Sequence, residues 1–234
     1  MTADSKKRLA ALQALEYVEN GMVVGLGTGT TADHFIDVLA AKVWEGQSVT
    51  AIASSIRTAE RARERGIPLK DIDQVSRIHL TIDGADEVDP QLRLIKGGGG
   101  ALLREKIVAS ASDRFIVIVD DSKLVDLLGR FPLPIEVVPF GFTLTTIKIC
   151  EALAEAGCPG HAVRLRETTA GQPFLTDSGN YILDCNCNII PLPEQLAERL
   201  CHVPGVVEHG LFIGLTSLVI IGREHGTEIL EAPR

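Results

Sequence analysis

The chain has 234 residues, of which 45% are hydrophobic and only 4% aromatic, and its formal net charge is −8. This composition suits one large domain, or a medium domain that carries a small one, and it excludes a disordered chain. The acidic charge argues against nucleic acid and anionic membranes as partners, and no apolar run approaches the ~20 residues that span a bilayer. Met1 to Arg8 lacks the apolar segment of a secretory signal, so we expect a cytoplasmic protein.

The chain holds five cysteines, an odd number for a fold closed by disulfides. It is also long enough to fold without such cross-links, so we expect reduced thiols. Cys185 and Cys187 form a C-x-C pair within an apolar run, where residues two apart on a strand share one face. Because no C-x-x-C motif or nearby histidine completes a metal or redox site, the pattern favours buried core thiols.

Hydrophobic periodicity predicts helices and strands that alternate through the first part of the chain. A first helix is capped by Asp4 or Ser5 and stopped by Gly21. Its apolar positions are Leu9, Leu12, Leu15 and Val18. Strands are expected at 22–26, 49–53, 78–82 and 115–119, a short extended run at 92–95, and further helices over 35–43, 57–65 and 101–112. This alternation predicts right-handed crossovers and an α/β fold with a Rossmann-like, mostly parallel sheet flanked by helices.

The character of the sequence changes at 131–134, where Phe-Pro-Leu-Pro interrupts any helix and indicates a linker. Beyond it the pattern predicts strands at 135–138, 162–165, 181–185 and 206–210, and helices at 143–155 and 193–201. The order βαββαβ predicts a smaller α+β, ferredoxin-like domain. A last strand at 218–221 returns to the first sheet, so the expected domains are 1–130 plus 207–234, and 131–206.

The segment from Gly27 to Ala32 joins a predicted strand to a predicted helix. Its glycines let the backbone approach an anion, the helix start offers N–H groups, and three threonines add hydroxyls. The segment also fits the dinucleotide fingerprint G-x-G-x-x-A, which requires an acidic residue at the end of the next strand. That strand ends in the pair Ser54-Ser55, which favours a phosphate or a sugar. A tight turn without a ligand remains the alternative.

Four acidic residues follow the strand at 78–82, in the sequence Asp-Gly-Ala-Asp-Glu-Val-Asp at 83–89. Their spacing differs from that of an EF-hand loop, and a solvated acidic loop is the ordinary alternative. The small residues Gly84 and Ala85 let the carboxylates of Asp83 and Asp86 approach a ligand closely. Carboxylates are good acceptors for sugar hydroxyls.

Four consecutive glycines, at 97–100, lie between Lys96 and a predicted helix that carries Glu105. A fold retains such a costly run where the backbone bends sharply or exposes its amides. A flexible loop and a surface ion pair at Glu105 are the alternatives. Lys123 closes a further segment at the end of a strand, 120–123, which also fits a capped helix start.

All four segments come at carboxyl ends of predicted strands, where α/β sheets bind ligands, so we expect one crevice to collect them. It would hold amides and hydroxyls for a phosphate, carboxylates for sugar hydroxyls, two lysines and one glutamate. The sequence has no Ser-His-Asp order and no metal-ligand cluster, and its six histidines are scattered. Proton transfer by a carboxylate, with cations that stabilise an oxyanion, is the chemistry that this inventory permits.

Taken together and in order, these motifs resemble the A type of ribose-5-phosphate isomerase. The matching segments are Gly-Thr-Gly-Thr-Thr at 27–31, Asp-Gly-Ala-Asp-Glu at 83–87, Lys-Gly-Gly-Gly at 96–99, Arg-Glu-Lys at 104–106 and Asp-Ser-Lys at 121–123. The resemblance continues through 131–137, 176–180 and 204–207 and covers nearly the whole chain. Two small departures are Thr30, where many members have serine, and Gly100, which often aligns with alanine.

The resemblance implies interconversion of D-ribose 5-phosphate and D-ribulose 5-phosphate in the pentose phosphate pathway. It implies no metal or other cofactor, and a homodimer or higher homo-oligomer. Glu105 would move a proton between C2 and C1 through an enediolate, with Lys96 stabilising the oxyanion, while Asp83 and Asp86 bind the sugar and assist ring opening. The residues expected to bind substrate are Thr28, Gly29, Thr30, Thr31, Asp83, Gly84, Ala85, Asp86, Lys96, Gly97, Gly98, Gly99 and Lys123.

Two other classes of protein share this kind of fold. A sugar-phosphate-sensing module of a transcription regulator requires a DNA-binding helix-turn-helix, and only one short helix precedes the first strand here. The rival enzyme is an amino-sugar-phosphate deaminase or a CoA-transferase relative. Such a transferase requires a nucleophilic glutamate and a larger acyl-carrier site, and activity on glucosamine 6-phosphate but not on ribose 5-phosphate would indicate the deaminase.

Overall fold

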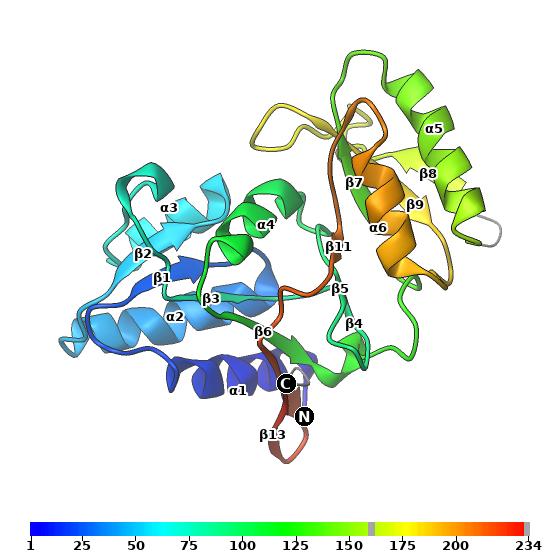
Figure 1. The fold of residues 1–234 in the computed structure, drawn as a ribbon. Coiled ribbons are helices and arrows are strands. Elements are labelled where there is room, and N and C mark those ends of the chain that lie inside the picture. The colour runs from blue at the N-terminus through cyan, green and yellow to red at the C-terminus, as the bar shows by residue number, and fades with distance from the viewer. Residues whose placement is uncertain (159–161, 232–234) are drawn as a thin grey trace. The chain divides into compact units, whose positions relative to one another are not determined.

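The computed structural model describes residues 1–158 and 162–231, which divide into two compact units (Figure 1). The first unit holds 1–85, 104–123 and 214–231, and the second holds 86–103 and the described part of 124–213. The division expected from sequence places 86–103 with the first unit. In the structure this segment groups with the second, because β4 (Glu87–Val88) and β5 (Leu94–Ile95) form a small sheet with β11 (Leu211–Phe212).

A six-stranded sheet in the order β13-β12-β6-β3-β1-β2 forms the centre of the first unit. Its parallel strands are β1 (Val23–Leu26), β2 (Thr50–Ala53), β3 (Leu80–Asp83), β6 (Phe115–Asp120) and β12 (Leu218–Arg223). At the edge, β13 (Gly226–Glu231) pairs antiparallel with β12 and is an addition to the predicted strands. The predicted α/β class, with a Rossmann-like and mostly parallel sheet, is confirmed.

The first unit's helices are α1 (Ala3–Leu15), α2 (Thr30–Trp44), α3 (Ile56–Glu64) and α4 (Leu102–Ser110). The first two residues of α4 belong to the second unit. The first unit also has two short 3-10 helices, η1 (Ile72–Gln74) and η2 (Asp121–Lys123). Alternate residues of β2 face opposite sides of the sheet. Ala51 joins the core cluster formed with α1 and α2, whereas Ile52 packs with Val108 of α4.

The buried face of α1 differs from the expected one. Its buried residues are Ala10, Ala11 and Ala14, while Leu12 is 42% exposed, and the helix ends at Leu15. The physical reason is a close approach between α1 and β12. A Cβ atom on Gly222 of β12 would lie 1.9 Å from the Lys6 carbonyl oxygen, so the helix lies against the strand with small side chains.

The second unit contains a four-stranded antiparallel sheet in the order β10-β7-β9-β8. Its elements are β7 (Leu133–Val137), α5 (Phe142–Glu155), β8 (Ala162–Leu165), β9 (Tyr181–Asn186), α6 (Pro193–Cys201) and β10 (Val206–His209). The order is the predicted βαββαβ. Cys185 and Cys187 are fully buried in the core between this sheet and its helices, which confirms the prediction of core thiols. Burial raises the pKa of the Cys185 thiol.

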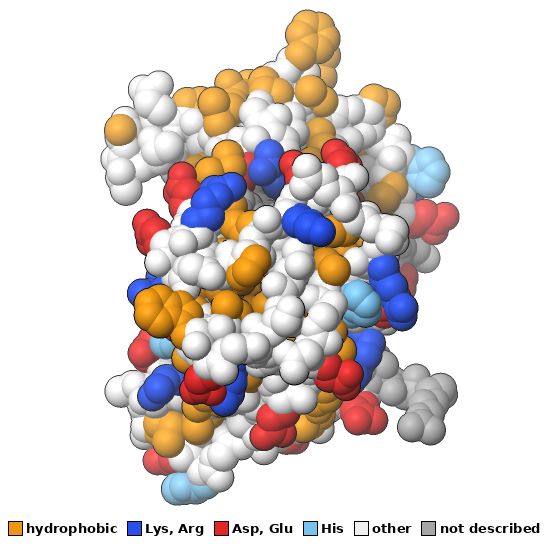
Figure 2. Space-filling model, turned by 90° about the vertical axis from the view of Figure 1, so that its left-hand side faces the viewer, with side chains coloured by type: hydrophobic (Ala, Val, Ile, Leu, Met, Phe, Trp, Pro, Cys, Tyr) orange, Lys and Arg blue, Asp and Glu red, His pale blue; other side chains and the backbone are white. Residues whose placement is uncertain are grey.

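The face drawn in Figure 2 shows acidic and basic side chains interspersed with hydrophobic ones. The net charge of −8 is therefore not gathered there into one acidic field. Within residues 1–158 and 162–231, no helix combines the length and the apolar character needed to cross a membrane.

Candidate active site

The loop between β1 and α2 is fixed to the end of β3. The Gly27 N–H donates to the Ile82 carbonyl at 2.9 Å, and the Thr28 N–H donates to Oδ1 of Asp83 at 3.0 Å. Gly29 precedes the first residue of α2 with φ of +113°, a conformation that side chains rarely adopt. This glycine therefore lets the chain turn into a helix whose N-terminal amides form an anion-binding end.

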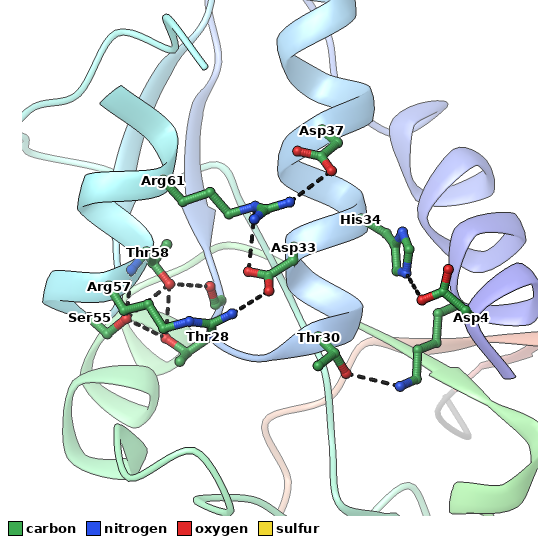
Figure 3. Close-up of polar contacts among 12 residues, drawn as sticks. Asp4, Thr28, Thr30, Asp33, His34, Asp37, Ser55, Arg57, Thr58 and Arg61 are labelled. Carbon is green, nitrogen blue, oxygen red and sulfur yellow. Dashed lines mark hydrogen bonds and ion pairs between the residues drawn. The ribbon is translucent and has the colours of Figure 1, made fainter. Parts of the chain in front are cut away.

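A cluster of hydroxyl groups braces the same loop (Figure 3). Thr28 Oγ1 donates to Ser55 Oγ at 2.9 Å, Ser55 donates to Thr58 Oγ1 at 2.9 Å, and Thr58 donates to the Gly27 carbonyl at 2.8 Å. Ser54 Oγ lies 3.0 Å from Thr28 Oγ1. Hydrogen bonds in such a chain polarise one another and stiffen the loop. The pair Ser54-Ser55 thus supports the backbone of the loop.

Lys7 of α1 also contacts the loop, although this lysine belongs to none of the sequence motifs. Its Nζ donates to Thr30 Oγ1 at 2.9 Å. An ammonium at the start of α2 adds positive charge where the helix dipole already favours an anion. Sequence gives no signal for this role, because a lysine on an outer helix is ordinarily a solvated surface residue. The neighbouring Lys6 instead binds both carboxylate oxygens of Asp121 at 2.8 Å.

Asp83 ends β3 with a carboxylate that is 1% exposed. Its Oδ1 accepts from the Thr28 N–H and, at 2.7 Å, from the Gly84 N–H. Backbone donors of this kind orient a carboxylate. A Cβ on Gly84 would lie 3.6 Å from Thr31 Cβ, so this glycine also lies against the loop.

The four acidic residues at 83–89 divide into two kinds. Buried Glu87 accepts from the backbone N–H groups of Gly129 at 2.7 Å and Phe131 at 2.6 Å. Asp89 is likewise buried and binds the backbone and side chain of Arg93. These two carboxylates therefore hold the local fold.

Among the described residues, no group of three or more His, Cys, Asp or Glu side chains is arranged to bind a metal ion.

The second unit holds Asp86, Lys96 and the glycine run. The Gly98 N–H donates to Oδ2 of Asp86 at 2.8 Å. The Lys96 side chain is 2% exposed, with Nζ at 5.4 Å from the centroid of the Phe212 ring, a favourable cation–π contact. Gly97 and Gly100 have φ of +104° and +81°. Gly97 and Gly100 are thus required for the backbone conformation of the run, and Lys96 is buried beside it.

Glu105 lies in the first turn of α4 and is 4% exposed. Buried carboxylates are rare outside ion pairs and functional sites. Lys123 ends η2 and is half-buried. The first unit accordingly holds Thr28, Gly29, Thr30, Thr31, Asp83, Gly84, Ala85, Glu105 and Lys123, and the second holds Asp86, Lys96, Gly97, Gly98 and Gly99. The first set comprises the amides at the start of α2, a buried aspartate, a buried glutamate and a half-buried lysine, and the second comprises an aspartate and a buried lysine beside the glycine run.

The whole chain is similar to one family of sugar-phosphate enzymes. The model of the family described as ribose 5-phosphate isomerase A (phosphoriboisomerase A) matches residues 50–226. Ribose-5-phosphate isomerase A of Parvibaculum lavamentivorans is 53% identical over 232 residues, which is 99% of this chain and 100% of the relative. The Maricaulis maris relative of the same name is 52% identical over 232 residues, again 99% of this chain and 100% of the relative.

Solved structures of similar sequence have the same fold. A D-ribose-5-phosphate isomerase in complex with phospho-erythronic acid superposes with a TM-score of 0.92 at 39% identity, covering 99% of this chain and 100% of that one. The ribose 5-phosphate isomerase of Plasmodium falciparum superposes with a TM-score of 0.92 at 37% identity and the same coverage.

Proposed function

The chain belongs to the ribose 5-phosphate isomerase A family and is an isomerase, and from that premise we propose that it interconverts D-ribose 5-phosphate and D-ribulose 5-phosphate through an enediolate. The observation that carries the mechanism is the buried carboxylate of Glu105 in the first turn of α4. A carboxylate in an enclosed site is a suitable base for removing a proton next to a carbonyl.

In the proposed reaction Glu105 removes the proton from C2 of the open-chain aldose. The electron pair of that C–H bond forms the C1–C2 double bond, and negative charge develops on O1. Lys96 stabilises this charge, which is present in the transition state and absent from the substrate. Glu105 then returns the proton to C1 while the O2 hydroxyl proton moves to O1, which yields the ketose.

The two aspartates are proposed to bind the sugar and to assist ring opening. Asp83 is oriented by two backbone N–H donors and Asp86 by one, so each presents a fixed acceptor to a hydroxyl group. A carboxylate that accepts the proton of the anomeric hydroxyl promotes cleavage of the ring C–O bond. These contacts support a sugar-binding role for both residues.

The phosphate is proposed to bind at the start of α2, in the loop from Thr28 to Thr31. The remainder of the substrate is proposed to contact Gly84, Ala85 and Gly97–Gly99. Amides at a helix N-terminus suit a dianion, and Lys123 is proposed to add charge. Lys7 joins this set on the strength of its bond to Thr30. The cations compensate for the net charge of −8, which otherwise repels an anionic substrate.

The test is an isomerase assay on ribose 5-phosphate in the presence of EDTA. We expect ribulose 5-phosphate to form at a rate that EDTA does not change, because none of the proposed steps uses a metal ion. Failure to form product would contradict the reaction, and a rate that requires added metal would contradict the mechanism. Activity on glucosamine 6-phosphate but not on ribose 5-phosphate would indicate a deaminase.

A second test uses the acid named in the complex of the related enzyme. The carboxylate of phospho-erythronic acid matches the two oxygens of an enediolate, so the acid is an analogue of the intermediate. We expect competitive inhibition with an inhibition constant below the KM for ribose 5-phosphate. The acid should inhibit the Lys96→Met variant much more weakly than it inhibits the wild type.

The same proposal includes a homo-oligomer, a homodimer or larger, that acts in the cytoplasm. Membership of the family supports it. Light scattering on the purified chain tests the assembly. A mass equal to that of one chain at micromolar concentration would contradict it.

A further inference from the structure

Arg166, which directly follows β8, clamps the glycine run of the second unit. Its Nη1 donates to the carbonyl oxygens of Gly97 at 2.9 Å and Gly98 at 3.2 Å. We infer that Arg166 is a positioning residue: it fixes the backbone that follows Lys96 and, through that backbone, orients Asp86. The catalytic consequence of this inference rests on the proposed function, whereas the structural consequence can be measured without it.

The guanidinium is itself held in one orientation. Nε donates to Oδ2 of Asp184 at 2.8 Å, and Nη2 donates to Oδ1 at 2.5 Å, a two-point contact with the neighbouring strand β9. The ring of Phe174 lies 5.9 Å from the guanidinium carbon. A planar fork bound at two points directs its remaining N–H groups along fixed lines, which a lysine ammonium does not do. Asp184 and Phe174 therefore aim Arg166 at the loop.

One peptide group connects Arg166 to Asp86. In a trans peptide the C=O and N–H bonds point in opposite directions. The peptide between Gly97 and Gly98 accepts from Arg166 at its oxygen and donates to Oδ2 of Asp86 at its nitrogen, at 2.8 Å. A cation at the carbonyl polarises the group and strengthens the bond that its N–H donates. The orientation of the Asp86 carboxylate thus depends on Arg166.

The glycine run has a particular need for such a clamp. Glycines lose more conformational freedom on ordering than other residues, so four in sequence do not hold one backbone conformation by themselves. Two of them, Gly97 and Gly100, also adopt positive φ angles. The contact of Arg166 with Gly98 directs the N–H group of Gly99 away from the guanidinium, by the same trans geometry. Arg166 therefore orders the amides of the loop as well as Asp86.

The test compares Arg166→Ala with Arg164→Ala, which removes an exposed arginine from β8, the strand that Arg166 follows. We expect kcat/KM to fall by between about 10- and 100-fold in Arg166→Ala, because small misplacement of reacting groups has effects of that size. Arg164→Ala should remain close to wild type. Arg166→Lys should recover little, since it lacks the fork, and added methylguanidine should restore part of the activity of Arg166→Ala.

Amide hydrogen exchange gives a readout that does not require activity. The Gly98 N–H should exchange at least about tenfold faster in Arg166→Ala, while amides of β7 keep their protection. Wild-type kcat/KM in Arg166→Ala together with unchanged Gly98 exchange would overturn the inference, and so would equal losses in Arg164→Ala. If the wild-type chain does not isomerise ribose 5-phosphate, the proposed function fails, and Gly98 exchange still decides whether Arg166 positions the loop.

Discussion

The carboxylate of Asp83 occupies the space that a side chain on residue 27 would need. A Cβ atom on Gly27 would lie 1.9 Å from Oδ1 and 2.1 Å from Cγ of Asp83. Asp83 ends β3, and Gly27 directly follows β1, the neighbouring parallel strand. Gly27 is therefore required for the position of the proposed sugar-binding carboxylate as well as for the approach of a phosphate.

Gly27→Ala should therefore displace the Asp83 carboxylate and weaken the first unit. We expect the free energy of unfolding to fall by about 1–3 kcal/mol, the usual range for an overpacked site, together with most of the isomerase activity. Gly84→Ala is the matched stability control, because its Cβ would make ordinary contacts at 3.6 Å and longer, and it should change stability by no more than about 0.5 kcal/mol. Urea unfolding of both variants measures the difference, and equal stability losses would contradict the steric argument.

Glu105→Gln should keep the fold and the affinity for substrate while losing turnover. The amide is nearly the same size as the carboxylate but does not accept a proton from carbon. We expect kcat to fall by roughly 100- to 10,000-fold, the typical contribution of a positioned general base, with KM changed by less than about threefold. Glu60→Gln, on the exposed side of α3, is the control. A near-wild-type kcat would remove Glu105 as the base.

Sequence predicted the alternation of elements well because their periodicity reflects burial. The predicted positions of the parallel strands differ from the observed ones by a few residues at most, and the predicted order βαββαβ is that of the second unit. Other features follow from tertiary contacts that no local pattern encodes. The alanine face of α1 depends on a close approach to Gly222, and the two-residue strands β4 and β11 are too short to show a period.

Within the candidate site, residue types could be predicted more readily than roles. Glu87 and Asp83 are four residues apart, and each accepts from two backbone N–H groups. The donors to Glu87 belong to residues 129 and 131, whereas those to Asp83 belong to Gly84 and to Thr28 in the loop before α2. Lys7 and Arg166 belong to no motif, and their contacts with Thr30 and Gly97 arise only when distant segments meet. The roles of such residues depend on geometry that composition does not contain.

Glu136 should stabilise the turn at 176–180. Its buried Oε1 accepts from Thr176 Oγ1 at 2.9 Å and from Asn180 Nδ2 at 2.9 Å. Glu136→Ala leaves the buried Thr176 hydroxyl and the half-buried Asn180 amide without their acceptor, so we expect the turn to lose about 1–3 kcal/mol of stability. Exchange of the Asn180 amide measures this loss, and Glu167→Ala, at an exposed position, should leave it unchanged. Unaltered exchange in Glu136→Ala would show that the turn is held by other contacts.

The ion pair between Lys6 and Asp121 should contribute stability that disappears in acid. The hydrogen bond from Lys6 lowers the pKa of Asp121 below its usual 3.8. Because the folded pKa is depressed, the contribution is complete above the unfolded pKa and is lost as pH falls through the folded value. Lys6→Met should be less stable than wild type by about 0.5 kcal/mol at pH 7, since the pair is partly exposed, and the difference should vanish once the pH has fallen through the folded pKa of Asp121. Lys70→Met, an exposed control, should show no such pH dependence.

The five thiols should differ in reactivity according to their burial. Cys201 is exposed, whereas Cys185 is fully buried, and desolvation raises the pKa of the Cys185 thiol. Alkylation requires both access and the thiolate, so iodoacetamide should modify Cys201 first and Cys185 only when the second unit unfolds. Peptide mass spectrometry against time measures both rates, and a urea-unfolded sample, in which the five thiols should react alike, is the control. Equal labelling rates of Cys185 and Cys201 in the native protein would contradict the prediction, because they would show that iodoacetamide reaches the core of the second unit without unfolding.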